Sequence, residues 1–392
     1  MFISVELRNI YKINKMKILH ICNDYCGSKV HANLYRELDR FGMNQTVFTC
    51  YRGYHEVGTN SFEAQHTDFI YRGVLSTKHR IFFHLKIKKV YKELLDAVNI
   101  QEYNIIHAIT LFTDGAVAYR VYKDYGIPYI ITVRNTDINE FMYVAPHTWR
   151  IGMKVLLNAQ KIIFISKAPM ESFCRHFLVK WMLPKIKERF IMQPNGLDDF
   201  WLDHLNKGII RKNCDIIYVG RFDWNKNVIR LAEAVLALKN EFGDIRLHLV
   251  GGDGDKEKKI IEIEQTNKDC IICHGKIYDK NVLRELYNQC SIFAMPSIHE
   301  TFGLVYIEAM SQNLAVLYTR NQGIDGLFDS RIGEAVNALS VESIKDGLRK
   351  LLKNRTYYDF QDSVDFEQFR WERIALRYKN IYDTFEKANS LH

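Results

Sequence analysis

The feature that most constrains the fold of this chain is a repeated alternation of short apolar segments with helical patterns. The segments are apolar throughout, which is typical of strands in a parallel sheet that is covered on both faces. In the first half of the chain they lie at residues 17–22, 46–50, 104–109, 128–133 and 161–166. The helix expected after the first segment carries its apolar side chains on one stripe, at Val30, Leu34, Leu38 and Phe41.

The same alternation restarts after the sequence QPNGLDDF, which occupies residues 193–200. We therefore predict an α/β protein with two doubly wound, Rossmann-like parallel-sheet domains that face a cleft. The predicted domains cover 16–200 and 201–365, and residues 1–15 are expected to be an N-terminal extension. Ligands of such sheets bind beyond the carboxyl ends of the strands. The apolar segments of the second domain are 215–220, 245–251, 269–273, 291–297 and 314–319.

Composition narrows the classes of function. The net charge of +8 over 392 residues is mild and spread out, which favours anionic small ligands or an anionic membrane surface over nucleic acid. Cys270 and Cys273 have no second close cysteine pair that would complete a zinc site, so we expect buried thiols and a reducing, cytoplasmic compartment. No apolar segment is long enough to span a membrane, and residues 1–15 lack the pattern of a signal peptide.

The sequence VGRFDWNKN at 219–227 is the first candidate for chemistry. Gly220 lets the backbone turn at the end of a predicted strand, and Arg221 and Lys226 lie in the loop that enters a helix. Two cations beside a helix N-terminus suit a diphosphate. The alternative is that both are solvated surface charges.

The sequence VGGDGD at 250–255 also follows a predicted strand. Gly252 and Gly254 have no third glycine at the dinucleotide-binding spacing, and the complete G-x-G-x-x-G pattern is absent from the whole sequence. We interpret the glycines as a tight strand-to-helix turn. The sequence therefore disfavours a nicotinamide-dependent dehydrogenase.

The sequence PSIHETFGLVYIEAM at 296–310 places two acids eight residues apart. A helix is expected to begin near Phe302 or Gly303, and the glycine would let a diphosphate approach free backbone N–H groups. Glu308 falls in the second turn, where it would reach a ribose, while Glu300 would accept hydrogen bonds from sugar hydroxyls. Pairs of glutamates at this spacing also occur on ordinary helices.

Taken together, these stretches resemble the Glu-x7-Glu pattern and its companions in the retaining GT-B glycosyltransferases of family four, the glycosyl transferases group 1 type. The resemblance covers nearly all of residues 16–387. Besides the three stretches above it includes QPNGLD at 193–198, CHGKI at 273–277 and FRWERIALRYKNIY at 369–382.

The resemblance implies a role for each matching residue. Catalytic roles fall to Arg221 and Lys226, which would neutralise the diphosphate of a nucleotide-sugar, and to Glu300, which would hold the transferred sugar. Glu308 would bind the ribose. The other substrate-binding residues implied by the matching motifs are Asn195, Gly220, Gly252, Thr301, Phe302, Gly303 and Leu304.

The resemblance also carries expectations about the reaction and the fold. The anomeric configuration would be retained, and no metal or other cofactor is implied, because the cations and helix dipoles would stabilise the leaving group. The terminal helix, at 366–392, is expected to cross back to the first domain.

The chain departs from the family pattern at two loops of the first domain. A glycine pair is usual in the loop after the first strand, whereas this chain has Gly27 followed by Ser28 and Lys29; the lysine would meet a phosphate or remain solvated. A histidine is usual after the strand ending at residue 133, whereas this chain has Arg134. Arg134 would hold an anionic acceptor or a donor group, or form an ion pair with Asp137 or Glu140.

Two segments, 77–95 and 173–190, mix basic with aromatic and aliphatic residues. They would rest on an anionic membrane, or else be core-facing helices with a solvated basic face. The sequence thus predicts a glycosyltransferase, cytoplasmic or peripheral at the inner face of a membrane, with a nucleotide-sugar donor and a glycan or lipid-linked acceptor. The alternatives are a nucleotide-sugar 2-epimerase of the same fold and a non-catalytic partner subunit.

Overall fold

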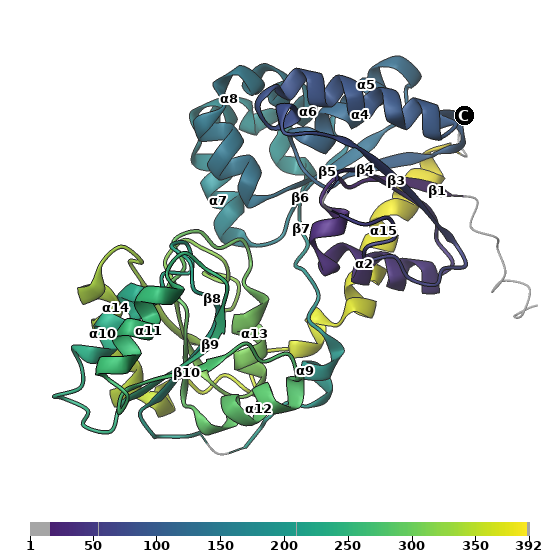
Figure 1. The fold of residues 1–392 in the computed structure, drawn as a ribbon. Coiled ribbons are helices and arrows are strands. Elements are labelled where there is room, and N and C mark those ends of the chain that lie inside the picture. Colours follow the sequence, from purple (N-terminus) through teal and green to yellow (C-terminus); the bar gives the residue numbers. More distant parts are fainter. Residues whose placement is uncertain (1–15, 54, 209, 390–392) are drawn as a thin grey trace, which may run out of the picture. The chain divides into compact units, whose positions relative to one another are not determined.

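The computed structural model describes residues 16–53, 55–208 and 210–389, so the predicted extension at 1–15 lies outside the described residues. The chain divides into two compact units (Figure 1). Unit 1 comprises Met1–Phe164, Cys174–Gln193 and Trp371–His392, and unit 2 comprises Ile165–Phe173 and Pro194–Arg370. Within the described residues, no helix is both long and apolar enough to cross a membrane.

Unit 1 is built on a seven-stranded parallel sheet in the order β3-β2-β1-β4-β5-β6-β7. All five segments predicted as strands in this half are strands, and β1 has four of its five residues fully buried. The strands are β1 (Lys17–Ile21), β2 (Asn44–Arg52), β3 (Thr67–Leu75), β4 (Ile105–Ala108), β5 (Tyr129–Val133), β6 (Lys161–Phe164) and β7 (Phe190–Met192).

Helices cover both faces of this sheet (Figure 1). On one face α2 (Lys29–Arg40) packs against α15 (Trp371–Asn389), and Leu34, Tyr35 and Leu38 share a core with Ile374 and Tyr382. The terminal helix begins at Trp371, after a short 3-10 turn. On the other face lie α3 (Lys78–Ile81), α4 (Phe83–Ala97), α5 (Thr113–Tyr125), α6 (Trp149–Asn158) and α8 (Phe177–Ile186).

Unit 2 is built on a six-stranded parallel sheet in the order β10-β9-β8-β11-β12-β13. Both sheets have the strand order of a Rossmann fold, so the predicted fold class is confirmed. The strands are β8 (Asp215–Arg221), β9 (Arg246–Gly252), β10 (Ile271–Gly275), β11 (Ile292–Ala294), β12 (Ala315–Thr319) and β13 (Gly333–Val336). The remaining helices are α7 (Lys167–Arg175), α9 (Asp199–Asp203), α10 (Val228–Leu236), α11 (Glu257–Thr266), α12 (Lys280–Gln289), α13 (Leu304–Ser311) and α14 (Val341–Lys353).

Candidate functional site

The candidate site lies in unit 2, where the strand order changes direction between β8 and β11. These two strands are neighbours in the sheet, but their following helices lead the chain away in opposite senses. Such a switch point leaves a crevice at the carboxyl ends of the strands, and ligands of open α/β sheets bind there. Arg221 ends β8, the loop after β8 carries Lys226, and the loop after β11 carries Glu300. The structure therefore brings together the three residues predicted to be catalytic.

Two asparagines fix the loops to each other. The Asn225 amide donates from Nδ2 to the His299 carbonyl (3.0 Å) and accepts at Oδ1 from the His299 backbone N–H (3.0 Å). The backbone carbonyl of Asn225 accepts from the Ile298 backbone N–H at 2.7 Å. Asn227 is buried in the left-handed conformation, with φ of 61°, and its amide donates to the carbonyls of Pro296 and Ala338. Both loops are therefore held by hydrogen bonds to backbone atoms.

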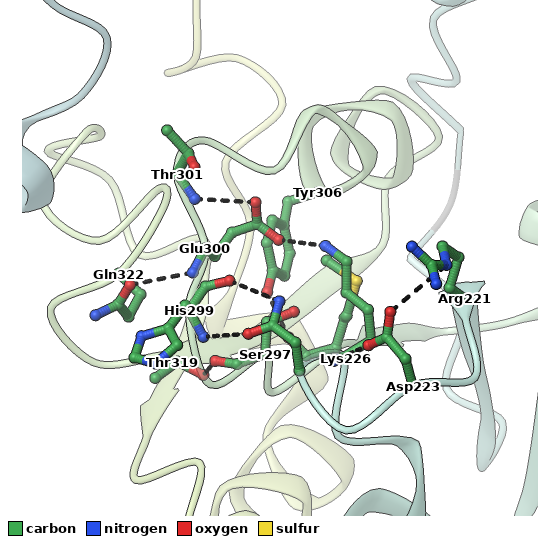
Figure 2. Close-up of polar contacts among 12 residues, drawn as sticks. Arg221, Asp223, Lys226, Ser297, His299, Glu300, Thr301, Tyr306, Thr319 and Gln322 are labelled. Atoms are coloured by element: carbon green, nitrogen blue, oxygen red, sulfur yellow. Dashed lines mark hydrogen bonds and ion pairs between the residues drawn. The ribbon is translucent and has the colours of Figure 1, made fainter. Parts of the chain in front are cut away.

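Lys226 and Glu300 form an ion pair, with 2.7 Å between Nζ and Oε2 (Figure 2). The other carboxylate oxygen of Glu300 accepts from the Thr301 backbone N–H at 3.1 Å. The Glu300 backbone N–H donates to the Gln322 side chain at 3.1 Å, and the Glu300 carbonyl accepts from the Gly323 N–H at 3.0 Å. Two contacts thus hold the carboxylate, and two more hold the backbone of the same residue. The Glu300 side chain is mostly buried, while the Lys226 ammonium is partly exposed.

Arg221 ends β8 and is the most exposed charge of the site, with 68% of its side chain open to solvent. Its Nε donates to the Asp253 carbonyl at 3.3 Å and lies 3.6 Å from a carboxylate oxygen of Asp223. The other Asp223 oxygen accepts from the Lys226 backbone N–H at 2.8 Å, so one acid connects both cations of the loop. These contacts are weak enough for the guanidinium to reorient towards a ligand phosphate.

The glycine turn after β9 allows a close backbone approach. A Cβ at Gly254 would lie 2.0 Å from the Phe222 carbonyl oxygen, and a Cβ at Gly251 would lie 1.8 Å from the Gly220 oxygen. Gly252 ends β9, and its carbonyl accepts from the Phe222 N–H at 3.1 Å. The glycines are therefore needed for packing against the Arg221 loop, in line with the predicted tight turn.

Helix α13 begins at Leu304, with Gly303 as its N-cap in the left-handed conformation (φ 76°). A Cβ at Gly303 would lie 2.4 Å from the Tyr306 ring, so glycine is required for both conformation and space. No side chain caps this helix start. Phe302 is buried in the core, and the Thr301 carbonyl accepts from the Ser166 hydroxyl at 3.0 Å. The Tyr306 N–H donates to the Gly303 carbonyl at 3.0 Å, and within the described residues the N–H groups of Leu304 and Val305 are left for an anion.

Glu308 lies in the second turn of α13 and is half-buried. Burial, helped by nearby Asp198 and opposed by Lys280, raises its pKa to about 7. The Lys280 ammonium bonds instead to Asp198, at 2.5 Å. Within the described residues, the Glu308 carboxylate makes no hydrogen bond or ion pair. It is a hydrogen-bond acceptor that is partly removed from water, and a hydroxyl group of a ligand would donate to it favourably.

Sequence reasoning did not identify the Asp198–Lys280 pair or the two loop-fixing asparagines. Asp198 caps α9, since its side chain accepts from the Phe200 backbone N–H, and the run LDD before an apolar segment was a signal for such a cap. Asn195, predicted to bind substrate, is half-buried in the loop before α9.

In unit 1, Gly27 ends a short 3-10 turn and Lys29 is the exposed first residue of α2. Arg134 follows β5, and its Nε lies 3.4 Å from the Ile109 carbonyl. The expected alternative, an ion pair with Asp137 or Glu140, is not found among the described residues. The Asp137 carboxylate instead accepts from three backbone N–H groups, those of Leu111, Phe112 and Arg134.

Two sheets of Rossmann strand order define the class of this protein: it is a two-domain α/β protein of the GT-B architecture. The family described as glycosyl transferases group 1 matches residues 200–365, which contain the whole candidate site. This match and the similarity to glycosyltransferases confirm the recognition, from the sequence motifs, of the GT-B glycosyltransferases of the family-four type.

Comparisons with individual proteins agree with this assignment. The chain is 26% identical over 190 residues to the lipopolysaccharide 1,2-N-acetylglucosaminetransferase of Salmonella typhimurium; the match covers 43% of this chain and 49% of that protein. It is 21% identical to a putative teichuronic acid biosynthesis glycosyltransferase of Bacillus subtilis, over 95% of this chain and 100% of that protein. The Anabaena protein HepE, solved with UDP and glucose, has the same fold, with a TM-score of 0.65, 14% identity and coverage of 94% and 100%.

Proposed function

We propose that this glycosyltransferase transfers a hexose from a nucleotide-diphosphate sugar to a glycan or lipid-linked acceptor, with retention of anomeric configuration. The observation that carries the proposal is the uncapped start of α13 at the switch point of unit 2, flanked by the Lys226–Glu300 pair. It is an anion site with hydroxyl acceptors beside it. The UDP bound to HepE and the sugar transfers named for the bacterial relatives support this reading.

The proposed roles of the residues follow from their charge and position. Arg221 and Lys226 neutralise the diphosphate as it leaves, and the α13 N–H groups bind its oxygens. Gly220, Gly252 and Gly303 permit the backbone to approach, next to Thr301, Phe302 and Leu304. Glu308 accepts from the ribose hydroxyls. Glu300, whose carboxylate and backbone are each held by two contacts, accepts from hydroxyls of the transferred sugar.

The reaction proposed here uses no protein nucleophile. The transition state resembles an oxocarbenium ion, and the acceptor attacks the face from which the diphosphate departs. A phosphate oxygen takes the acceptor proton. The two cations perform the charge stabilisation for which other transferases use a divalent ion, so the proposed transfer is metal-independent. Asn195, Gly27, Lys29 and Arg134 remain proposed substrate contacts.

We place the reaction in the synthesis of a cell-surface polysaccharide or glycolipid, with the enzyme cytoplasmic or peripheral at the inner face of the membrane. The proposal is tested by a thermal-shift screen of UDP-, GDP- and ADP-sugars, because a ligand that binds the folded protein raises its melting temperature. The stabilising donor is then incubated with protein alone, and its products are followed by NMR.

We expect slow release of free sugar. The sugar should first appear with the same anomeric configuration as it has in the donor. Formation of an epimerised nucleotide-sugar would instead indicate a 2-epimerase. Donor binding without turnover, with or without glycan extracts as acceptor, would indicate a non-catalytic subunit. Absence of any nucleotide-sugar binding would contradict the whole assignment of the site.

A further inference from the structure

A surface of unit 1, remote in sequence from the candidate site, combines exposed apolar side chains with unpaired cations. Its apolar members are 52 to 76% exposed and lie at the corner between α3 and α4, in the segment after β5, and on α8. They are Ile81, Phe82, Leu85, Tyr143, Val144, Phe177 and Trp181. We call this set, together with the six cations named below, the aromatic-basic surface.

Ring contacts connect the three segments that carry this surface. Phe83, at the start of α4, lies 5.8 Å from Phe141 between ring centroids and 6.5 Å from His147. Tyr143 lies 5.3 Å from His176, which immediately precedes α8. These contacts lead from the α3–α4 corner across the segment after β5 to the start of α8.

Hydrogen bonds hold the middle of the surface rigidly. The Met142 carbonyl accepts from Trp149 Nε1 at 2.9 Å and lies 3.2 Å from His176 Nε2. The Trp149 ring lies 5.3 Å from Phe177. The exposed apolar groups at Tyr143 and Phe177 therefore stand on a base that is held by hydrogen bonds and ring contacts.

The charges on this surface are of one sign. Its exposed cations are Lys78, Arg80, Lys88, Arg150, Lys180 and Lys185, and none forms an ion pair within the described residues. Lys185 lies over the Trp181 ring, 5.5 Å from its centroid. Residues 77–92, 141–164 and 174–187 contain no aspartate or glutamate, although the whole chain has 46 acids in 392 residues.

Not every lysine of these segments faces outward. Lys86 is half-buried close to Asp114 and Asp24, and Lys89 pairs with Glu93 at 2.8 Å. Lys88, between them, is exposed and unpaired. The outward face is therefore narrower than the basic sequence pattern indicates, and substitutions that test it must avoid Lys86.

We propose that the aromatic-basic surface docks on a lipid bilayer that contains anionic headgroups, with its aromatic side chains in the interface and its cations on the phosphates. Exposed Trp, Phe and Tyr beside Lys and Arg are the composition that membrane interfaces select. Anionic lipid supplies the negative charge that the protein lacks here. A second copy of the chain is a poor occupant, because two such surfaces would bring like charges together without an acid between them.

The inference rests on the proposed function at one point: docking on a bilayer would give the enzyme access to a lipid-linked acceptor. Its test needs no sugar donor. Wild-type protein is floated with vesicles of phosphatidylcholine alone and with vesicles that also contain phosphatidylglycerol. We expect binding to the second kind only, weakened by high salt. Donor binding measured in parallel by thermal shift reports on unit 2 independently, so failure of one proposal is distinguishable from failure of the other.

Two variant sets locate the contact. Lys88→Glu with Lys180→Glu and Lys185→Glu should lower the partition coefficient on the order of 100-fold or more, since each cation contributes about a factor of five to ten. The matched control reverses three exposed lysines elsewhere, Lys123, Lys259 and Lys268, and should reduce binding far less.

The apolar contribution is tested separately. Phe82→Ser with Trp181→Ser should reduce binding at least tenfold, while Val57→Ser with Leu376→Ser, which also removes two exposed apolar side chains, should not. No vesicle binding by the wild type, equal binding to neutral vesicles, or equal losses in test and control variants would overturn the proposal. So would light scattering that shows a dimer dissociated by Phe82→Ser with Trp181→Ser, which would indicate an interface between copies.

Discussion

Replacing Glu308 by glutamine should make the free protein more stable and nucleotide binding weaker. Burial and Asp198 raise the pKa of this carboxyl from 4.5 to about 7, so the folded protein binds its proton more tightly than the unfolded chain does. The contribution of Glu308 to the stability of the wild type therefore falls as the pH rises from about 4.5 to about 7. Above that range, ionised Glu308 lowers the free energy of unfolding by up to about 3 kcal/mol. Glutamine does not ionise, so the variant is free of this loss.

The assay is urea denaturation of the wild type and Glu308→Gln at pH 5 and pH 8. The two proteins should be nearly equally stable at pH 5, and the variant should be more stable at pH 8 by up to about 3 kcal/mol. Glu285→Gln, at an exposed acid on α12, is the control and should change stability by less than about 0.5 kcal/mol at either pH.

Nucleotide binding should change in the opposite direction. If the Glu308 carboxylate accepts from a ribose, Glu308→Gln should weaken binding of the stabilising nucleotide about tenfold or more at pH 8, because a hydrogen bond to a charged acceptor is lost. Unchanged affinity in calorimetric titration would refute the ribose assignment. An equal stability difference at pH 5 and pH 8 would refute the claim that Glu308 is a desolvated, unpaired acid.

Four further outcomes are expected. Arg221→Ala should lower kcat more than nucleotide affinity, since charge on the diphosphate grows in the transition state; steady-state kinetics at saturating donor separates the two. Gly254→Ala should cost about 1–3 kcal/mol in denaturation, because its Cβ would collide with the Phe222 carbonyl. Arg134→Lys and Arg134→His should each lose most transfer and keep nucleotide binding; wild-type transfer rates would remove Arg134 from the site. The buried histidines should lower stability as the pH falls below 6.5, because burial lowers the pKa of His107, and that of His20 to about 3, so that only the unfolded chain accepts these protons readily; since Glu308 acts in the opposite direction, urea denaturation should show acid to be more destabilising, or less stabilising, for Glu308→Gln than for the wild type.

The central strands of both sheets were predictable because burial on two faces makes a strand apolar along its whole length. The strands that the sequence pattern missed are β3, β7 and β13, all at sheet edges. None of them is fully buried: β3 has one buried residue in nine, and β7 has none. An edge strand has one neighbour and a solvent-facing side, so its residues are mixed and its periodicity is weak.

The residue types of the candidate site were predictable from the sequence. The partners that these residues contact were less predictable. Gly303 was expected at the start of a helix, and it caps α13. The ion pair between Lys226 and Glu300 joins residues 74 positions apart in sequence, and the sequence indicated only separate roles for them. Likewise His107, in β4, is buried between Tyr382 of the terminal helix and Thr132. Such contacts depend on how distant segments pack, which local patterns do not encode.

The two units share a topology, and a difference between their switch points supports the proposed phosphate-binding role of unit 2. Helix α5 follows β4 in unit 1 as α13 follows β11 in unit 2. Just before α5, the backbone N–H groups of Leu111 and Phe112 bind the carboxylate of Asp137, at 3.0 and 3.1 Å. The chain's own anion therefore occupies the position where a phosphate would bind. At α13 no side chain takes that place, and Lys226 and Arg221 stand in the adjoining loop. Because an anion at a helix start is stabilised by the same N–H groups whatever its source, the helix left without an internal anion is the one that a nucleoside diphosphate can use.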